Sequence, residues 1–208
     1  METEKYWNPV LETMPRGQLE KFQLKRFKES MQYAMDHSPF YERKYRETGI
    51  TTDDIKTLDD VRKVPLVDKS MFKEAQKDKG PHPYGELLAV PIEQVMSHSQ
   101  TSGTTGTPVY LPDSFESFQD WIESWCYCLY GMGFRNRDVV FMPFPYNVYI
   151  GFWMGHLGAQ KIGCKVFPGG GLDTRARIRT MKEIEATATM CTPTYGLHMA
   201  KVAAEMGL

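Results

Sequence analysis

Long apolar runs are missing from this sequence of 208 residues. No stretch approaches the roughly 20 consecutive apolar residues that a membrane-spanning helix needs. The aromatic run from Phe141 to Trp153 comes nearest, but two prolines, an asparagine and a glycine interrupt it. The first residues, Met-Glu-Thr-Glu-Lys, are polar and lack the apolar core of a secretory signal. We therefore expect a cytoplasmic protein with no membrane partner.

An excess of charge of either sign is missing as well. The chain has 25 Lys and Arg residues against 26 Asp and Glu residues, for a formal net charge of −1. Nucleic-acid-binding domains are usually strongly basic, so we expect no nucleic-acid partner. Hydrophobic residues make up 41% of the chain, which is typical of a folded globular protein. The composition leaves a homodimer open.

Cysteine is scarce, with four residues in the whole chain. Cys126 and Cys128 form a C-x-C pair, but no second Cys/His pair follows at a spacing typical of zinc sites. On a helix, residues two apart do not share a face. We therefore expect reduced cysteines and no metal site.

Helix signals dominate residues 1–80. Ser38 and Pro39 are typical of a helix start, and Gly49 of a helix end. Further short helices are expected around residues 58–61 and from Asp68 onward. Before these, apolar side chains recur at helical spacing at Leu24, Phe27, Met31, Ala34 and Met35.

Residues 81–208 show a different rhythm. Residues 80–85 read as a connector, and residues 87–90 as the entry to a strand. Strands are then expected at 138–142, 165–167 and 187–191, and helices at 113–131, 151–163, 174–185 and 193–206. This alternation predicts an α/β fold, with the helical N-terminal section followed by part of a mainly parallel sheet with flanking helices. Ligands bind such sheets beyond the carboxyl ends of the strands.

One segment, Gln100 to Pro108, has a composition suited to anion binding. Its Thr-Ser-Gly-Thr-Thr-Gly core provides hydroxyl donors, and its glycines let backbone amides turn toward an anion. A Walker A loop is excluded because residue 108 is proline and the segment holds no lysine. A flexible Ser/Thr/Gly linker has the same composition and stays open at this point.

The segment T-S-G-T-T-G-T-P resembles the phosphate loop of the adenylate-forming superfamily, which includes acyl-CoA synthetases. The whole chain resembles the N-terminal part of a phenylacetate–CoA ligase type enzyme, through Ser38–Tyr41, Val64–Lys69, His156–Ala159 and Thr192–Tyr195. Many members carry lysine where this chain has Thr107 or Val109. The resemblance implies that ATP phosphates bind at Thr101, Ser102, Gly103, Thr104, Thr105, Gly106 and Thr107.

The resemblance also implies a reaction and its substrates. A carboxylic acid, ATP with Mg²⁺, and coenzyme A would give an acyl-CoA, AMP and pyrophosphate. It implies an incomplete N-domain, because the catalytic lysine of the family is expected beyond residue 208, in a C-terminal domain. We therefore expect no turnover from this chain alone.

Aromatic residues follow the strand expected at 138–142. By resemblance, Phe144 and Tyr149 fall where the family lines an aryl-acid pocket, and Tyr195 lies at the same sheet edge. Aromatic rings could stack on an aryl acid such as phenylacetate. Ordinary core packing of the three rings and an aliphatic acid both stay open.

Other polar residues receive structural interpretations. We expect the helical His156 to be a packing or hydrogen-bonding residue, and Asp173 to start a later helix. Arg175, Arg177 and Arg179 are expected on a solvated face. Gly169 to Gly171 either form a simple turn or line the nucleotide cleft.

Two other functions stay open. One is a different adenylylating synthetase of the same branch, such as an enzyme that adenylylates a deazaflavin cofactor. The other is a non-catalytic nucleotide-binding remnant that keeps the fold.

Overall fold

The computed structural model describes residues 5–77, 80–101 and 106–208. These residues form two compact units, one of residues 9–118 and one of residues 119–208 together with the N-terminal residues up to Asn8. The predicted boundary at residue 80 follows the change in secondary-structure pattern and stays a prediction. No helix among the described residues combines the length and the apolar character that crossing a membrane requires.

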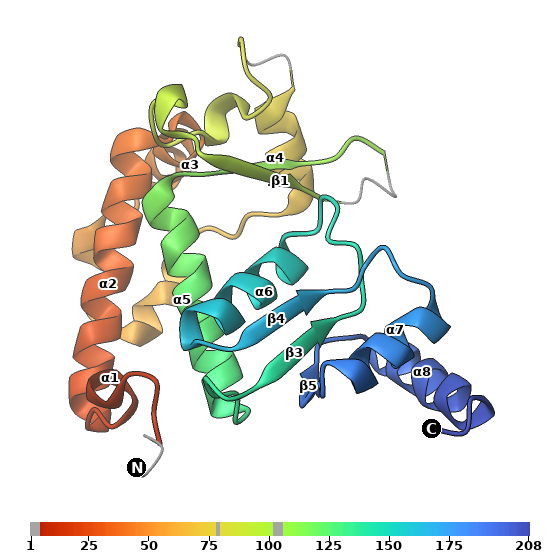
Figure 1. Cartoon of the computed structure of the whole chain (residues 1–208). Helices are drawn as coiled ribbons and strands as arrows, with labels where there is room; N and C mark the ends of the chain where they lie inside the picture. The colour runs from red at the N-terminus through yellow and green to blue at the C-terminus, as the bar shows by residue number, and fades with distance from the viewer. Residues whose placement is uncertain (1–4, 78–79, 102–105) are drawn as a thin grey trace. The chain divides into compact units, whose positions relative to one another are not determined.

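The first unit is mainly helical, as predicted (Figure 1). Its core contains Met31, Tyr45, Ile50 and Ile55, and the other residues of the predicted helical stripe pack against them. Ser38 and Gly49 bound a helix, as expected, and Gly49 is left-handed at φ +70°. The helices are α1 (Pro9–Glu12), α2 (Arg16–His37), α3 (Pro39–Thr48), η1 (Thr52–Asp54), η2 (Leu58–Lys63), α4 (Lys69–Gln76), η3 (Gly85–Leu87) and η4 (Ile92–Gln94).

The strand entry expected at residues 87–90 is absent from this described stretch, so that expectation was wrong. The chain forms the short helix η3 there and continues without a strand partner. Two backbone carbonyls here bind side-chain hydroxyls in place of a neighbouring strand. The hydroxyl of Ser38 donates to the Glu86 carbonyl, and the hydroxyl of Tyr33 donates to the Ala89 carbonyl. Backbone acceptors bonded in this way have no need of a sheet.

A two-stranded antiparallel sheet closes the first unit. It pairs β1 (Ser97–Gln100) with β2 (Tyr110–Asp113), with Gln100 opposite Tyr110. Helix α5 (Phe115–Gly131) then begins in the first unit and continues into the second. The glycine-rich segment therefore joins two paired strands.

The second unit contains a three-stranded parallel sheet in the order β4-β3-β5. Val140, Phe141 and Met142 of the central strand are buried, which accounts for their continuous apolar character. The elements are β3 (Val139–Met142), α6 (Ile150–Ile162), β4 (Lys165–Pro168), α7 (Thr174–Glu183), β5 (Ala188–Thr189) and α8 (Pro193–Glu205). The predicted alternation of strands and helices is confirmed.

Small residues let α6 pack closely. A Cβ added to Gly158 would lie 2.9 Å from the Cβ of Trp125 on α5, and one added to Gly155 would lie 3.0 Å from the sulfur of Met190. Figure 1 shows α6 running beside β4 and β3. The small residues of this helix predicted tight packing on its neighbours, and these close approaches confirm it.

Candidate functional site

The glycine- and hydroxyl-rich segment is held at its base by the two strands. The amide of Thr101 donates to the Val109 carbonyl, and the amide of Val109 donates to the Thr101 hydroxyl oxygen, both at 3.0 Å. The Thr101 hydroxyl is therefore an acceptor inside the hairpin, and its own hydrogen is left to donate elsewhere. Four of the predicted phosphate-binding residues, Ser102, Gly103, Thr104 and Thr105, lie outside the described residues.

The described end of the segment, at Gly106 and Thr107, is exposed. Gly106 has φ +113°, a conformation that favours glycine. A Cβ at Gly106 would meet no atom within 4 Å. Val109 is only 2% exposed and anchors the segment. The chain therefore buries an apolar side chain where many members of the superfamily carry lysine.

Gln76 supports the second strand of the hairpin, and the sequence did not reveal this role. Its side-chain amide donates to the Tyr110 carbonyl at 2.6 Å and accepts from the Tyr110 amide at 3.0 Å. A glutamine thus satisfies both backbone groups of one residue, as a neighbouring strand would. Only a pattern linking α4 to β2 across 34 residues could have predicted it.

Two of the three predicted acid-pocket residues meet at the carboxyl ends of β3 and β5. The rings of Phe144, just after β3, and Tyr195, on α8, have centroids 4.9 Å apart. Phe152 of α6 stacks on Phe144 at 5.0 Å. These rings come from three elements that converge at the edge where α/β sheets bind ligands.

Tyr149 joins the same cluster through Phe152, with centroids 5.2 Å apart and the rings nearly perpendicular. Its side chain is 60% exposed, so it lies at the margin. The aromatic cluster is then Phe144, Tyr146, Tyr149, Phe152, Trp153 and Tyr195. Tyr146, Phe152 and Trp153 were not singled out from sequence, although their density in one short stretch was a usable signal.

A polar pair lies inside the cluster. The hydroxyl of Tyr146 is 2.7 Å from Nδ1 of His156. Burial raises the pKa of Tyr146 to about 12, so the phenol keeps its proton at neutral pH. Burial also lowers the pKa of His156, although a hydrogen bond with Gln160 opposes this. The expectation that His156 packs and hydrogen-bonds within the fold is confirmed.

Arg177 does not belong to a solvated face, so that expectation was wrong for this residue. Its guanidinium donates to the Gly169 carbonyl at 3.1 Å, to the Gly170 carbonyl at 2.8 Å and to the Tyr195 hydroxyl. The side chain is half-buried by these contacts, whereas Arg175 and Arg179 are exposed as expected. Its partners come from distant segments, which helical periodicity does not reveal.

The turn after β4 packs directly on the strand and the cluster. A Cβ added to Gly169 would overlap the ring of Phe141, and one added to Gly170 would lie 2.5 Å from the Phe144 carbonyl oxygen. Asp173 then caps α7 by accepting from the Ala176 amide at 2.8 Å, as expected. The two glycines thus allow a close approach of backbone to side chain.

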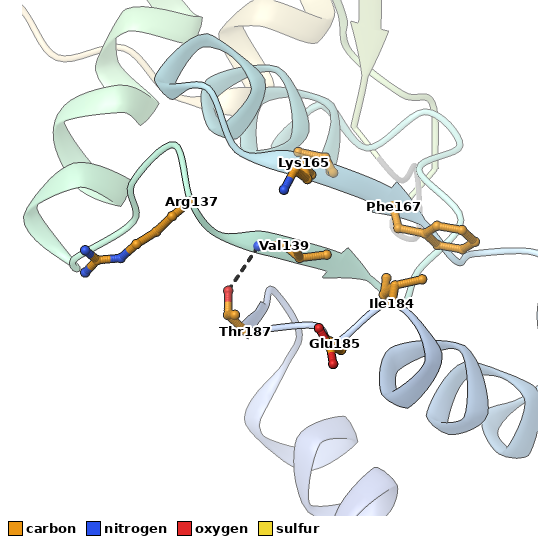
Figure 2. Close-up of a pocket in the computed structure, with 8 residues that line it drawn as sticks. Arg137, Val139, Lys165, Phe167, Ile184, Glu185 and Thr187 are labelled. Atoms are coloured by element: carbon orange, nitrogen blue, oxygen red, sulfur yellow. Dashed lines mark hydrogen bonds between the residues drawn. The ribbon is translucent and has the colours of Figure 1, made fainter.

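A hollow of the second unit lies away from the aromatic cluster. It has a volume of about 560 Å³ and lies on the face of the sheet that carries Lys165 and Phe167, toward the amino ends of β3 and β4 (Figure 2). Figure 2 also shows the hydroxyl of Thr187 bonded to the Val139 amide, at 3.0 Å. None of the predicted site residues lines this hollow. The aromatic rings, by contrast, converge at the edge of the sheet where α/β folds bind ligands.

Neither cysteine nor acidic clusters suggest a bound metal in the part of the chain that the structure describes. Over those residues, no group of three or more His, Cys, Asp or Glu side chains is arranged to hold an ion. The four cysteines are free, and Cys126 is buried while Cys128 is exposed. Burial raises the pKa of Cys126 to about 11, so this thiol is protonated at neutral pH.

Comparison with known proteins reveals clear relatives. Phenylacetate–coenzyme A ligase of Pseudomonas putida is 29% identical over 198 residues, which is 95% of this chain and 44% of that protein. The enzyme of the same name from Escherichia coli K12 is 28% identical over 91% of this chain and 42% of its own length. The chain thus spans less than half the length of these relatives. No protein-family model matches it.

Solved structures give the same result for the fold. The structure of 2-hydroxyisobutyryl-CoA ligase in complex with 2-HIB-AMP and CoA, in the thioesterification state, is 32% identical with a TM-score of 0.91, over 99% of this chain and 43% of that chain. An open conformation of the same ligase matches at 30% identity, also with a TM-score of 0.91. By sequence and by fold, the chain is therefore related to the adenylate-forming acid–CoA ligases of the phenylacetate–CoA ligase type.

Proposed function

We propose that this chain is the phosphate-loop part of an ATP-dependent carboxylic acid–CoA ligase. In the first step, a carboxylate oxygen attacks the α-phosphorus of ATP, and the bond to pyrophosphate breaks, giving an acyl-adenylate. In the second step, the thiol of coenzyme A attacks the acyl carbon and AMP leaves. The observation that carries the proposal is the similarity to phenylacetate–coenzyme A ligases over 95% of the chain.

The segment from Thr101 to Thr107 would hold the β- and γ-phosphates of ATP. Charge develops on the phosphate oxygens during the first step, and fixed donors stabilise it. The hydrogen of the Thr101 hydroxyl and the exposed backbone at Gly106 support this role. We propose that Mg²⁺ arrives with the nucleotide. No general base is needed, because a carboxylic acid is already ionised at neutral pH.

The chain by itself is expected to give no turnover. It spans 42–44% of the curated relatives, so more than half of a whole ligase has no counterpart here. By resemblance, the catalytic lysine and the groups that hold adenine, ribose and Mg²⁺ belong to that missing part. A cytoplasmic location and a homodimer stay predictions.

An aryl acid such as phenylacetate is the proposed substrate. The aromatic cluster supports it, since ring faces and edges stack favourably on an aryl group. A second candidate is a small hydroxy acid, because two solved ligase structures that are 30% and 32% identical to the chain contain 2-HIB-AMP. Competition between phenylacetate and 2-hydroxyisobutyrate for the chain would rank the two.

Binding measurements test the proposal without requiring turnover. Isothermal titration of the chain with Mg²⁺–pyrophosphate examines the phosphate loop alone, and titration with Mg²⁺–ATP adds the nucleoside. We expect both to bind. Acid-dependent exchange of pyrophosphate into ATP by this chain would contradict the expectation of inactivity.

The same measurements separate the other candidate functions. Only weak binding of pyrophosphate and ATP favours the non-catalytic remnant that keeps the fold. A chain that binds ATP but neither candidate acid favours an adenylylating synthetase with a different acceptor.

A further inference from the structure

The guanidinium of Arg177 makes three hydrogen bonds to two segments that are distant from each other in sequence. Its Nε and Nη2 donate to the carbonyls of Gly169 and Gly170, in the turn after β4. Its Nη1 donates to the hydroxyl of Tyr195, on α8. A planar guanidinium can present these donors in one fixed geometry, which a lysine ammonium cannot.

Both the hydroxyl and the ring of Tyr195 have partners. The hydroxyl of Thr174, which lies one turn before Arg177 on α7, is 3.1 Å from the Tyr195 hydroxyl. The Tyr195 ring contacts Phe144, with centroids 4.9 Å apart. Residues three apart on a helix share a face, so Thr174 and Arg177 of α7 both reach the Tyr195 hydroxyl. Phe144 contacts the ring.

The turn that Arg177 binds reaches the same aromatic residue. Gly170 packs on the backbone of Phe144, where an added Cβ would lie 2.5 Å from the carbonyl oxygen. Arg177 therefore contacts two of the neighbours of Phe144, the turn and Tyr195. Without the guanidinium, the turn and Tyr195 would lose the hydrogen bonds that fix them beside the Phe144 ring.

The positive charge of Arg177 is not neutralised within the described chain. Its three acceptors are uncharged oxygens, and no Asp or Glu among the described residues forms an ion pair with it. On the same helix, Arg175 pairs with Glu205 at 3.6 Å. The N–H donors of Arg177 therefore fix the positions of uncharged acceptors and do not neutralise an acidic side chain.

We propose that Arg177 is a positioning residue for the acid pocket, which holds the phenol of Tyr195 and the turn at Gly169 and Gly170 in place around Phe144. The expected effect on affinity for the acid rests on the proposed function. The hydrogen-bonding geometry itself can be tested without any ligand.

The first measurement follows Tyr195 directly. NMR spectra of the chain with ¹³C-labelled tyrosine rings are compared for the parent, Arg177→Lys, Arg177→Gln and Arg179→Gln. We expect both Arg177 variants to shift the Tyr195 ring signals, because neither replacement has the planar three-donor geometry of the guanidinium. Lysine keeps the charge alone. Arg179→Gln removes a charge from the same helix and should leave these signals unchanged.

The second measurement is the affinity for phenylacetate, obtained by titration of the intrinsic fluorescence. Arg177→Lys and Arg177→Gln should each weaken binding roughly tenfold, and Arg179→Gln should not. In a Tyr195→Phe background, the additional loss from Arg177→Gln should be much smaller, since a residue that acts through Tyr195 couples to it. Circular dichroism melting confirms that each variant is folded.

Each outcome decides the proposal. Restoration of parent affinity and parent Tyr195 signals by Arg177→Lys would show that charge alone matters, and would overturn it. If the Arg177 variants do not fold, Tyr195→Phe replaces them, because it removes the acceptor of the Arg177 Nη1–H. Loss of the Nη1–H signal, protected in the parent, supports the contact, and an unchanged signal overturns it. A parent chain that binds no phenylacetate contradicts the proposed function, while the ligand-free spectra still decide the positioning role.

Discussion

The hydroxyl of Tyr146 forms a hydrogen bond with Nδ1 of His156, at 2.7 Å, inside a cluster of aromatic rings. Burial lowers the pKa of His156 from its usual value of 6.5, so the folded chain holds this imidazole neutral. A neutral imidazole can accept the phenol proton, whereas a protonated one has no acceptor nitrogen. The pair therefore links the packing of α6 to pH.

This linkage predicts how stability changes with pH. Between the lowered pKa of the folded state and 6.5, the unfolded chain binds more protons, so the free energy of unfolding rises with pH. We expect the contribution of His156 to be complete above about pH 7 and to be lost progressively below 6.5. Melting temperatures measured between about pH 5.5 and 7.5 should vary less in His156→Gln than in the parent. Equal pH dependence in the two proteins would exclude this role for His156.

A second prediction concerns the turn after β4. Gly170→Ala should lower the free energy of unfolding by about 2 kcal/mol or more, because the new methyl group meets the backbone of Phe144. The matched control is Gly171→Ala, where an added Cβ meets no atom within 4 Å. Urea unfolding of both variants measures the difference. Similar stabilities for the two alanine variants would show that the turn adjusts freely.

A third prediction separates the phosphate loop from general backbone strain. Gly106 has φ +113° and Gly133 has φ +98°, and neither would place a Cβ within 4 Å of another atom. Gly106→Val and Gly133→Val should therefore cost similar stability, while only Gly106→Val abolishes binding of Mg²⁺–pyrophosphate. Gly103→Val is expected to act like Gly106→Val. Parent affinity in a folded Gly106→Val chain would remove the phosphate-loop assignment.

A fourth prediction tests the support of the hairpin from α4. Gln76→Leu leaves the amide and carbonyl of Tyr110 without their partner, so we expect a loss of about 1–2 kcal/mol in unfolding free energy. Hydrogen exchange at the Tyr110 amide should accelerate in this variant. Glu74→Gln, an exposed change on the same helix, is the control. Unchanged exchange at Tyr110 would mean that β1 alone holds the strand.

A fifth prediction grades the rings of the acid pocket. Phe144→Ala should weaken phenylacetate binding about tenfold, because Phe144 contacts both Tyr195 and Phe152. Tyr149 is 60% exposed, so Tyr149→Ala should have an effect of about threefold or less. Fluorescence titration measures both. Equal affinity in the parent and in Phe144→Ala would place the pocket elsewhere.

Much of the fold could be predicted because its signals are local. Ser38, Pro39 and Gly49 bound α3 through their own backbone preferences, and Asp173 caps α7 through a contact three residues away. The buried strand β3 was readable from its unbroken apolar run. Such features depend on neighbours in sequence, and the sequence contains those neighbours.

The features that sequence reasoning missed depend on distant partners. Arg177 looked like part of a charged helix surface, and only the fold brings the turn at Gly169 and the phenol of Tyr195 within reach of it. Residues 87–90 looked suitable for a strand, but the side chains of Tyr33 and Ser38 engage this region instead. In both cases, side chain to backbone hydrogen bonds across the fold outweighed the local pattern.

The paired contacts of Gln76 with Tyr110 have a further consequence, for solubility. An outer strand with free amides and carbonyls is a template on which another polypeptide can add a strand, and this is a route to aggregation. At Tyr110 the glutamine already takes both positions, and it belongs to a helix that cannot extend the sheet. The side chain therefore ends sheet growth at this point and protects the hairpin from unwanted pairing.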